Sequence, residues 1–267
     1  MNFVCPKCGL PFSLLGSSAV CPKKHSFDRA RAGYFNLLLS ASGGTHGDNA
    51  EMVEARRIFL DTGAYKPLSD KVAELAEKYI SGGTVLDIGC GEGYYTDAIY
   101  RALLGRGVVV SAFDISREAC KRAARRNREI ELAVASAYKM PVADGSFSGA
   151  VNMFSPLASG EVWRALMPGG IFIMAVPGEN HLLGLKRAAY KTPYKNELAD
   201  TALEGFELID TAHIEYNIEL KSNAEVRSLF MMTPYAYRTP PQDRERVLML
   251  PSLVTEVEFW VFVYRKN

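Results

Sequence analysis

The sequence has no long apolar run and almost no net charge. Its 267 residues are 48% hydrophobic and 23% charged, with 31 basic and 30 acidic side chains. No stretch approaches the roughly 18 apolar residues that a membrane-spanning helix needs, and the first six residues lack the basic-then-apolar order of a secretory signal. These absences argue against membrane and exported proteins, so we expect a cytoplasmic protein with at most two folded units.

Cysteine is also scarce, with five residues, and three of them fall within the first 21 positions. The motif Cys5-Pro6-Lys7-Cys8 is followed twelve residues later by Cys21-Pro22-Lys23-Lys24-His25. Three thiolates and one imidazole make a complete tetrahedral set for zinc, with no open position. Reduced cysteines packed as small hydrophobic residues are the alternative. We predict no disulfides and one closed, structural Zn²⁺ site, with the ligands Cys5, Cys8, Cys21 and His25.

Positive charge gathers near the N-terminus, although the whole chain is nearly neutral. Residues 1–36 carry five basic side chains and one acidic side chain, whereas the remainder has 26 basic and 29 acidic side chains. A locally positive module suits a phosphate-rich partner such as RNA. A solvated basic surface without a partner is an equally simple interpretation of five charges.

A segment rich in glycine and serine, residues 40–49, predicts a flexible connection. We therefore divide the chain into a zinc-binding module at residues 1–39, a linker with two leading helices at 40–83, and a main domain at 84–267. In the middle part, Asn49 is placed to cap a helix that ends near residue 60. Pro67 stands at a first-turn position of the second helix.

From residue 84 onward, short apolar runs alternate with helical patterns. Strands are expected at 85–88, 108–113, 130–134, 149–154 and 171–176, and helices after residue 93 and at 116–127. This alternation predicts parallel strands with crossover helices, and therefore an α/β, doubly wound sheet. Residues 206–220 and 255–264 have the pattern of longer strands that could pair antiparallel.

The sequence Val85-Leu86-Asp87-Ile88-Gly89-Cys90-Gly91-Glu92-Gly93 joins an expected strand to three alternating glycines and a helix. Glycines at Gly89, Gly91 and Gly93 permit a sharp turn and close approach of a ligand to the backbone. Asp87 ends the first strand, and Asp114 ends the second, where its two oxygens can accept both hydroxyls of a ribose. A nucleotide-like ligand is therefore expected here.

The spacing D-x-G-x-G-x-G differs from the dinucleotide-binding G-x-G-x-x-G and resembles the cofactor loop of S-adenosylmethionine-dependent methyltransferases. Residues 139–147 and 166–170 resemble the loops before strands four and five of that superfamily. The resemblance implies a Rossmann-like class I methyltransferase sheet with S-adenosylmethionine as methyl donor. Another α/β nucleotide enzyme is the alternative, because a fold alone does not determine a function.

Further segments extend the likeness over essentially the whole chain. They are the cysteine and histidine set, His25-Ser26-Phe27-Asp28, Gly33-Tyr34-Phe35-Asn36-Leu37-Leu38, Gly47-Asp48-Asn49-Ala50-Glu51-Met52, Ala55-Arg56-Arg57 and Asp61-Thr62-Gly63-Ala64-Tyr65-Lys66-Pro67-Leu68. With these, the sequence resembles the bacterial 23S ribosomal RNA guanine-N1 methyltransferases, which modify a guanine in one hairpin loop.

The resemblance implies transfer of a methyl group to a guanine of a 23S rRNA hairpin. It also implies a homodimer whose zinc modules help to form an RNA-binding cleft, with no membrane or DNA partner. Cofactor contacts are implied for Tyr65, Gly91, Glu92 and His181, and zinc ligation for the cysteine and histidine set.

We further expect Ser155-Pro156, Tyr235 and Tyr237 to form a pocket in which the tyrosines stack on an extruded base. Core packing of these tyrosines is the alternative. Two other classes of protein also remain open. A small-molecule methyltransferase would keep the glycine loop, and a non-catalytic zinc RNA-binding protein would keep the N-terminal module.

Overall fold

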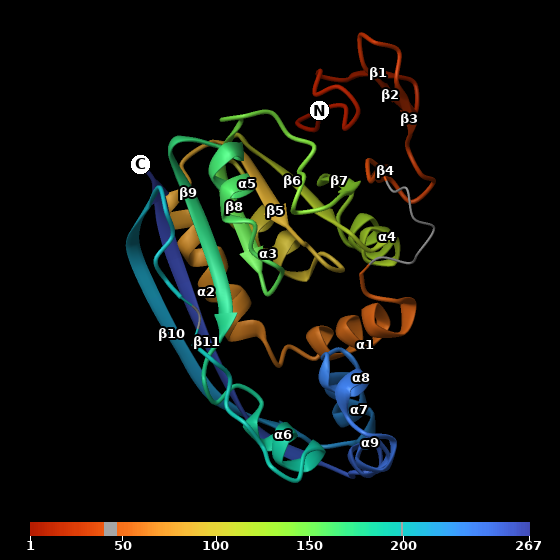
Figure 1. Ribbon diagram of the computed structural model, residues 1–267, viewed down its shortest axis with the longest axis vertical. Helices are drawn as coiled ribbons and strands as arrows, with labels where there is room; N and C mark the ends of the chain where they lie inside the picture. The colour runs from red at the N-terminus through yellow and green to blue at the C-terminus, as the bar shows by residue number, and fades with distance from the viewer. Residues whose placement is uncertain (40–46, 199) are drawn as a thin grey trace.

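Two sheets organise the chain, as the computed structural model in Figure 1 shows; it describes residues 1–39, 47–198 and 200–267. The small sheet lies in the N-terminal module and contains β1 (Ser13–Leu15), β2 (Ser18–Val20) and β3 (Ser26–Asp28). The large sheet contains eight strands. They are β4 (Phe35–Asn36), β5 (Gly83–Ile88), β6 (Val108–Asp114), β7 (Glu131–Val134), β8 (Phe147–Met153), β9 (Leu166–Pro177), β10 (Phe206–Leu220) and β11 (Leu253–Lys266).

The strand order of the large sheet is β10-β11-β9-β8-β5-β6-β7-β4. The strands from β9 to β4 pair in parallel, and β11 pairs antiparallel with both β9 and β10. From the central β5, the chain builds outward first through β6 and β7, and then on the other side through β8 and β9. This reversal creates a crevice at the carboxyl ends of β5 and β8, where α/β proteins bind ligands. The doubly wound Rossmann-like sheet predicted from the sequence is confirmed.

Nine helices in the described part of the chain accompany the large sheet. The helices before and between the first parallel strands are α1 (Ala50–Asp61), α2 (Lys66–Tyr79), α3 (Tyr94–Ala102) and α4 (Arg117–Arg126). Those of the second half are α5 (Ser159–Ala165), α6 (Leu183–Ala189), α7 (Asn223–Met231), α8 (Tyr235–Arg238) and α9 (Pro241–Leu248). The predicted Asn49 cap is confirmed, since its side chain accepts a hydrogen bond from the first turn of α1. The side chain of Ser116 caps α4 in the same way.

Alternate residues of the central strands enter two hydrophobic clusters, one on each face of the sheet. On β5, Val85 belongs to the cluster with α2, α3 and α4, whereas Leu86 and Ile88 belong to the other. Because side chains of a strand alternate between faces, this division is what a sheet covered on both sides requires. Because both faces of β5 are covered, residues 85–88 show a nearly continuous apolar pattern and not a simple alternation.

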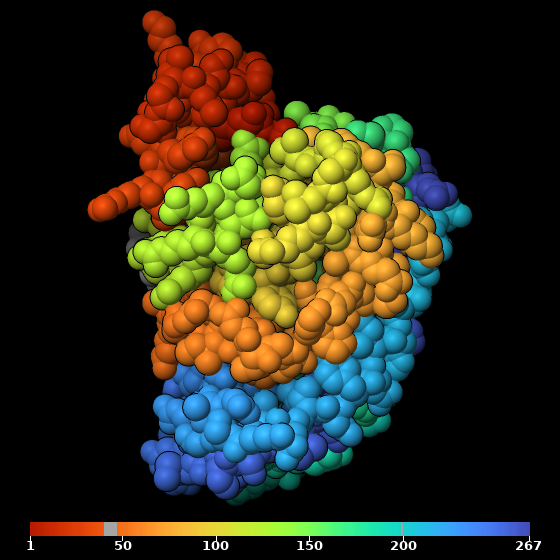
Figure 2. All heavy atoms as spheres, turned by 180° about the vertical axis from the view of Figure 1, so that it is seen from behind, coloured from red at the N-terminus to blue at the C-terminus, as the bar shows by residue number. Residues whose placement is uncertain are grey.

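The N-terminal module helps to cover the second face. Phe3 is fully buried in the second cluster, and the backbone amide of Val4 donates to the carbonyl of Pro141 over 2.8 Å. Strand β4 adds an edge to the large sheet beside β7, which the sequence patterns did not indicate. Figure 2 shows that the rest of the module stands out from the main body, at the end opposite to the segment with α7 and α9.

The two long C-terminal strands pair as expected. Strands β10 and β11 run antiparallel over almost their entire length, from the pair Phe206–Lys266 to the pair Leu220–Leu253. The antiparallel pairing predicted for residues 206–220 and 255–264 is therefore confirmed, whereas helices α5 to α9 had not been predicted. In the described part of the chain, no helix is long and apolar enough to cross a membrane. Residues 40–46 of the predicted connection lie outside the described residues.

Candidate zinc centre and cofactor cavity

The four predicted zinc ligands come together in the N-terminal module. One donor atom from each of Cys5, Cys8, Cys21 and His25 lies within 4.8 Å of all the others. Two tight backbone turns achieve this: the amide of Gly9 donates to the carbonyl of Cys5, and the amide of Lys24 donates to that of Cys21. Lys24 has a φ of +62°, which bends the second turn back toward the cluster.

The distances between the donor atoms suit a tetrahedral zinc ion. The Nδ1 atom of His25 lies 3.4 Å from the Sγ atoms of both Cys5 and Cys21, and the Sγ atoms of Cys8 and Cys21 are 3.6 Å apart. Zn–S bonds of about 2.3 Å and a Zn–N bond of about 2.0 Å would place such donors roughly 3.5–3.8 Å apart. All four positions are supplied by the protein, so the set fits a structural zinc.

A second site is a cavity of about 330 Å³ at the carboxyl ends of β5, β6 and β8. It lies where the strand order reverses, which is the expected position for a nucleotide-like ligand. The predicted Asp87, Gly89, Gly91, Glu92 and Asp114 all line it. The remaining lining residues are Gly47, Asp48, Arg56, Leu60, Cys90, Tyr94, Tyr95, Ile115, Met153, Phe154, Ser155 and Pro156.

The glycine loop needs its glycines for two different reasons. Gly89, Gly91 and Gly93 have φ angles of +75°, +56° and +88°, which residues with a side chain rarely adopt. In addition, a Cβ atom at position 89 would lie only 2.4 Å from the Cβ of Ser155. The missing side chain of Gly89 therefore leaves room for the turn that follows β8. Gly93 does not line the cavity and instead lets α3 approach Ala123 of α4.

Asp87 lies beneath this loop and is 1% exposed. Its Oδ2 accepts a hydrogen bond of 2.6 Å from the hydroxyl of Thr96, whereas Oδ1 is buried and without a partner. Burial raises the pKa of Asp87 to about 7, and the nearby charge of Asp114 adds to this effect. A carboxylate in this position would be stabilised by a positively charged ligand, because the surrounding protein offers it only one hydroxyl.

Asp114 supports the loop from the end of β6. Its Oδ2 accepts from the backbone amide of Gly91 over 2.9 Å, and Oδ1 accepts from the amide of Ser116 over 2.7 Å. Burial raises the pKa of Asp114, and the two amides oppose this shift. Each carboxylate oxygen has a further lone pair, so both can still accept the hydroxyl of a ribose.

Glu92 is buried in the loop and paired with Arg126 of α4. Two guanidinium nitrogens of Arg126 lie 2.9 and 2.7 Å from Oε2 of Glu92, and the same guanidinium contacts Asp61 at the end of α1. Burial raises the pKa of Glu92, while Arg126 lowers it. The other oxygen, Oε1, is buried and has no hydrogen-bond partner.

Unpaired polar atoms gather at this cavity. In the described part of the chain, five buried side-chain atoms lack a hydrogen-bond partner, and three of them belong to lining residues: Asp87 Oδ1, Glu92 Oε1 and Tyr95 OH. A buried polar atom without a partner costs about 1–3 kcal/mol, so such a cluster indicates a ligand that supplies the partners. S-adenosylmethionine, with its ribose hydroxyls, ammonium group and sulfonium, fits a cavity lined by four carboxylates.

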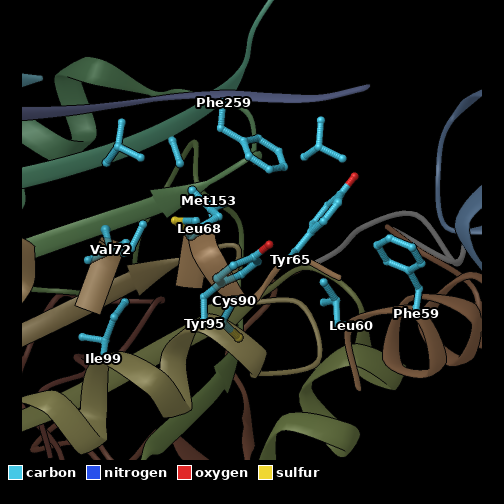
Figure 3. Packing of buried hydrophobic residues seen from close by; sticks show 14 of the residues in the cluster. Phe59, Leu60, Tyr65, Leu68, Val72, Cys90, Tyr95, Ile99, Met153 and Phe259 are labelled. Carbon is cyan, nitrogen blue, oxygen red and sulfur yellow. The ribbon is translucent and has the colours of Figure 1, made fainter. Parts of the chain in front are cut away.

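The remaining two cofactor contacts predicted from the resemblance, Tyr65 and His181, do not line this cavity. The hydroxyl of Tyr65 lies 3.3 Å from Nε2 of His181, and Nδ1 of His181 accepts from the backbone amide of Glu258. Burial lowers the pKa of His181 to about 3, so its imidazole is neutral. Figure 3 shows the Tyr65 ring between those of Phe59 and Phe259. The centroid of the Tyr65 ring lies 4.9 Å from that of Phe59 and 5.0 Å from that of Phe259.

Asp48, Arg56 and Tyr95 also line the cavity, although the sequence did not assign them to a site. Asp48 and Arg56 lie in segments that carry the family resemblance. Arg56 of α1 forms an ion pair with Asp48 and donates to the carbonyl of Met232 over 3.3 Å, so it links α1 to the segment before it and to the end of α7. Tyr95 stands in the first turn of α3, directly after the glycine loop. The position of Tyr95 directly after the glycine loop is the signal that could have found it, whereas the contact of Arg56 with Met232 joins residues 176 positions apart.

Of the residues expected around a target base, Ser155 and Pro156 line the cavity, and Tyr235 and Tyr237 do not. Tyr235 lies at the start of α8, where its ring packs edge-on against Tyr190 and contacts the ammonium group of Lys186. Tyr237 is exposed.

Comparisons with known proteins agree with both sites. Residues 85–170 match a family model described as "Methyltransferase domain", and residues 3–39 match a zinc-ribbon model described as "RlmA, N-terminal". The chain is 30% identical over 260 residues to the Streptomyces fradiae 23S rRNA (guanine(748)-N(1))-methyltransferase, covering 93% of this chain and 91% of the relative.

The chain is also 32% identical over 279 residues to a Micromonospora griseorubida protein that is provisionally named a 23S rRNA (guanine-N(1)-)-methyltransferase. The match covers 94% of this chain and 92% of the relative. Both matches cover more than nine-tenths of this chain. The chain therefore belongs to the 23S rRNA (guanine-N1)-methyltransferase family.

Proposed function

We propose that this protein transfers a methyl group from S-adenosylmethionine to N1 of a guanine in 23S rRNA. The products are N1-methylguanosine and S-adenosylhomocysteine. The observation that carries this proposal is the cavity at the carboxyl ends of β5, β6 and β8, in which three buried polar atoms have no partner. Membership of the family supports guanine N1 as the acceptor, and the zinc module supports RNA as the class of substrate.

The proposed cofactor contacts divide among the elements that meet at the cavity. Asp114 would accept the ribose hydroxyls, and Asp87 and Glu92 would provide carboxylate oxygens for its positive groups. The backbone at Gly89 and Gly91 allows close approach, and Gly93, which does not line the cavity, supports the loop through its packing against α4. From the family resemblance we also propose that Tyr65 and His181 contribute, although both lie behind the cavity lining.

The bound cofactor supplies an already activated methyl group on its sulfonium, so the residues of this chain need mainly to orient the base and exclude water. Met153, Phe154 and Tyr95 form an apolar wall suited to both tasks. Neutral guanine carries a proton on N1, and an acceptor close to that nitrogen would ease its loss as the methyl arrives.

We propose that the target guanine lies in a hairpin loop and that Tyr235 and Tyr237 stack on RNA bases near the site. Replacing either tyrosine by alanine is then expected to reduce RNA methylation by about 5- to 100-fold, the range of a lost base–aromatic contact. Cofactor affinity, measured by calorimetry, would stay unchanged. Full RNA methylation by both variants would show that these rings serve only packing.

Four further assignments belong to the same proposal. We propose a homodimer whose zinc modules help to form the RNA-binding cleft, and a cytoplasmic location in which the five cysteines, none of them in a disulfide, stay reduced. Neither a membrane nor DNA is a proposed partner. The division into residues 1–39, 40–83 and 84–267 is retained as the proposed domain organisation.

The test is transfer of labelled methyl from S-adenosylmethionine to 23S RNA that lacks its native modifications, followed by nucleoside analysis. We expect labelled N1-methylguanosine. Cofactor binding without labelled RNA would favour a small-molecule methyltransferase, whose ligand binding should also be insensitive to salt. RNA binding without cofactor binding would favour a non-catalytic zinc RNA-binding protein, which would not explain the unpaired atoms of the cavity.

A further inference from the structure

Phe154 combines three features that are not found together in any other described residue of the cavity lining: an aromatic ring, a left-handed backbone and partial exposure to solvent. Its φ angle is +61°, and the residue lines the cavity with 41% of its surface exposed. Its neighbour Met153 is 7% exposed and lies at the end of β8. The chain therefore turns sharply after β8 and directs one aromatic ring outward.

The turn that carries Phe154 is held from several sides. Its amide donates to the carbonyl of Ala175 over 3.2 Å. The next amide, of Ser155, donates to the side chain of the buried Asn152, and the Ser155 hydroxyl donates to the carbonyl of Ile88 over 2.8 Å. Gly89 adds the space into which the Ser155 side chain fits. These contacts tie the position of Phe154 to the cofactor loop.

A left-handed conformation is unfavourable for a bulky residue and persists only where the surroundings impose it, most often at functional sites. Glycine would adopt the same φ without strain. An aromatic residue at this position therefore indicates that the ring itself has a functional role.

One part of the Phe154 ring is packed, and the rest is open. The ring lies 5.4 Å from that of Phe259 in a tilted arrangement and 6.2 Å from that of Tyr95, edge-on. Phe259 is fully buried, and Figure 3 shows it in the same hydrophobic cluster as Tyr95. The two supporting rings hold Phe154 in place without covering it, which suits a surface for stacking.

We propose that Phe154 is the residue on which the target guanine stacks, so that N1 faces the cofactor cavity. This inference rests on the proposed function and names a substrate-binding residue for it. A flat, apolar ring next to the cofactor can receive a base that has left its own stack, because every base presents an aromatic face. Stacking determines the plane of the base, and N1 must receive the methyl group within that plane.

The first experiment compares Phe154→Leu, Phe154→Tyr and Phe154→Trp with the wild-type enzyme. We expect the leucine variant to lose about 10- to 100-fold in kcat/KM for RNA, the range of one base–aromatic contact. The tyrosine and tryptophan variants should stay within about threefold, since both keep an aromatic face. In all variants the calorimetric Kd for S-adenosylmethionine is expected to change less than about threefold.

Two further variants separate stacking from folding. Phe154→Gly suits the φ of +61° and should keep the melting temperature while losing methylation as the leucine variant does. Tyr138→Leu, a matched control at a 69% exposed aromatic outside the cavity lining, should retain full kcat/KM.

The Phe154→Trp variant also gives a reading independent of turnover. Its added tryptophan should be quenched by substrate RNA in the presence of S-adenosylhomocysteine, relative to the wild-type enzyme with its two tryptophans. Retention of kcat/KM within twofold by the leucine variant would overturn the inference, as would tryptophan emission that RNA leaves unchanged. If the wild-type enzyme itself fails to methylate RNA, the proposed function falls, and this inference with it.

Discussion

The zinc centre and the cofactor cavity are built on opposite principles. The four zinc ligands lie within 21 residues of one another in the sequence, and their donor atoms are brought together by two local turns. The cavity instead collects residues from position 47 to position 156, on three strands, two helices and the loops beside them. Local geometry suffices for the first site, and the complete sheet is needed for the second.

The two sites also differ in how they satisfy their polar groups. The zinc ligands form a closed set in which every donor faces the other three, as expected of a structural metal. The cavity leaves buried atoms of Asp87, Glu92 and Tyr95 unpaired and holds Phe154 in a strained conformation. A site that stabilises the fold satisfies its own groups, whereas a site that binds a ligand leaves part of that task to the ligand.

The largest expected effect concerns the zinc centre. Cys21→Ser removes one thiolate of a metal whose binding contributes about 10–16 kcal/mol in zinc-finger peptides, so the variant should lose its zinc, measured as metal per chain by atomic emission. Cys120→Ser, outside the cluster, is the matched control and should keep one zinc. If the two sites are independent, cofactor affinity in Cys21→Ser stays within about threefold of wild type. A zinc-loaded Cys21→Ser protein would contradict the ligand assignment.

The second-largest expected effect is a loss of cofactor affinity caused by a steric clash between residues 89 and 155 in the cavity lining. Gly89→Ala introduces a Cβ atom 2.4 Å from Ser155, at a φ of +75°, and should weaken S-adenosylmethionine binding by about 100-fold. Gly105→Ala is a matched control, because Gly105 has a φ of +79° but no atom within 4 Å of the added Cβ. Equal effects of both substitutions on calorimetric Kd would mean that backbone strain, and not the Ser155 contact, is responsible.

A smaller effect should appear as a dependence on pH. The pKa of Asp87 is raised to about 7 by burial, so below that pH the free protein carries a neutral carboxyl group. A positively charged cofactor favours the carboxylate, and the proton must then leave on binding. Affinity for S-adenosylmethionine is therefore expected to rise by about tenfold as the pH increases from about 6 to 8.

Asp87→Asn provides the control for this titration, since an amide cannot lose the proton. Its cofactor affinity should be weaker and independent of pH over the same range. Calorimetry in buffers of different ionisation enthalpy would count the released proton directly. A wild-type affinity that does not vary between pH 6 and 8 would be inconsistent with an Asp87 contact.

The smallest expected effect concerns Tyr65, behind the cavity. Tyr65→Phe removes the hydroxyl beside His181 and, if Tyr65 contributes to cofactor binding, should weaken affinity by about 2- to 10-fold, the value of one hydrogen bond. Tyr216→Phe loses one hydrogen bond as well, from its hydroxyl to the carbonyl of Ala64, and should leave cofactor affinity unchanged. Identical Kd values for both variants and wild type would assign Tyr65 to the core alone.

Much of the parallel sheet could be predicted from the sequence, because its strands are short apolar runs separated by helices with recognisable caps. The predicted ranges 85–88, 108–113 and 130–134 lie within or closely overlap β5, β6 and β7. Strand β4 was missed, since two residues show no periodicity and pair with β7 only after the main sheet exists. Helices α5 to α9 were missed because most are short and gain their stability from tertiary contacts.

For the sites, spacing in the sequence predicted the zinc ligands and the acids that end β5 and β6, since both depend on local chain geometry. Spacing did not predict Arg56, whose contacts with Asp48 and Met232 include a residue 176 positions away. Nor did it predict the left-handed Phe154, whose turn depends on Asn152, Ala175 and Ile88 on three neighbouring strands.

The sequence by itself determined the two kinds of site, a metal cluster and a nucleotide-like pocket, because each requires particular residues at fixed short spacings. Only the tertiary structure decided which polar atoms would be left unpaired and which aromatic ring would face the cavity. Those properties depend on packing between segments far apart in the chain, where the arrangement of each strand limits the space and the hydrogen bonds available to the next.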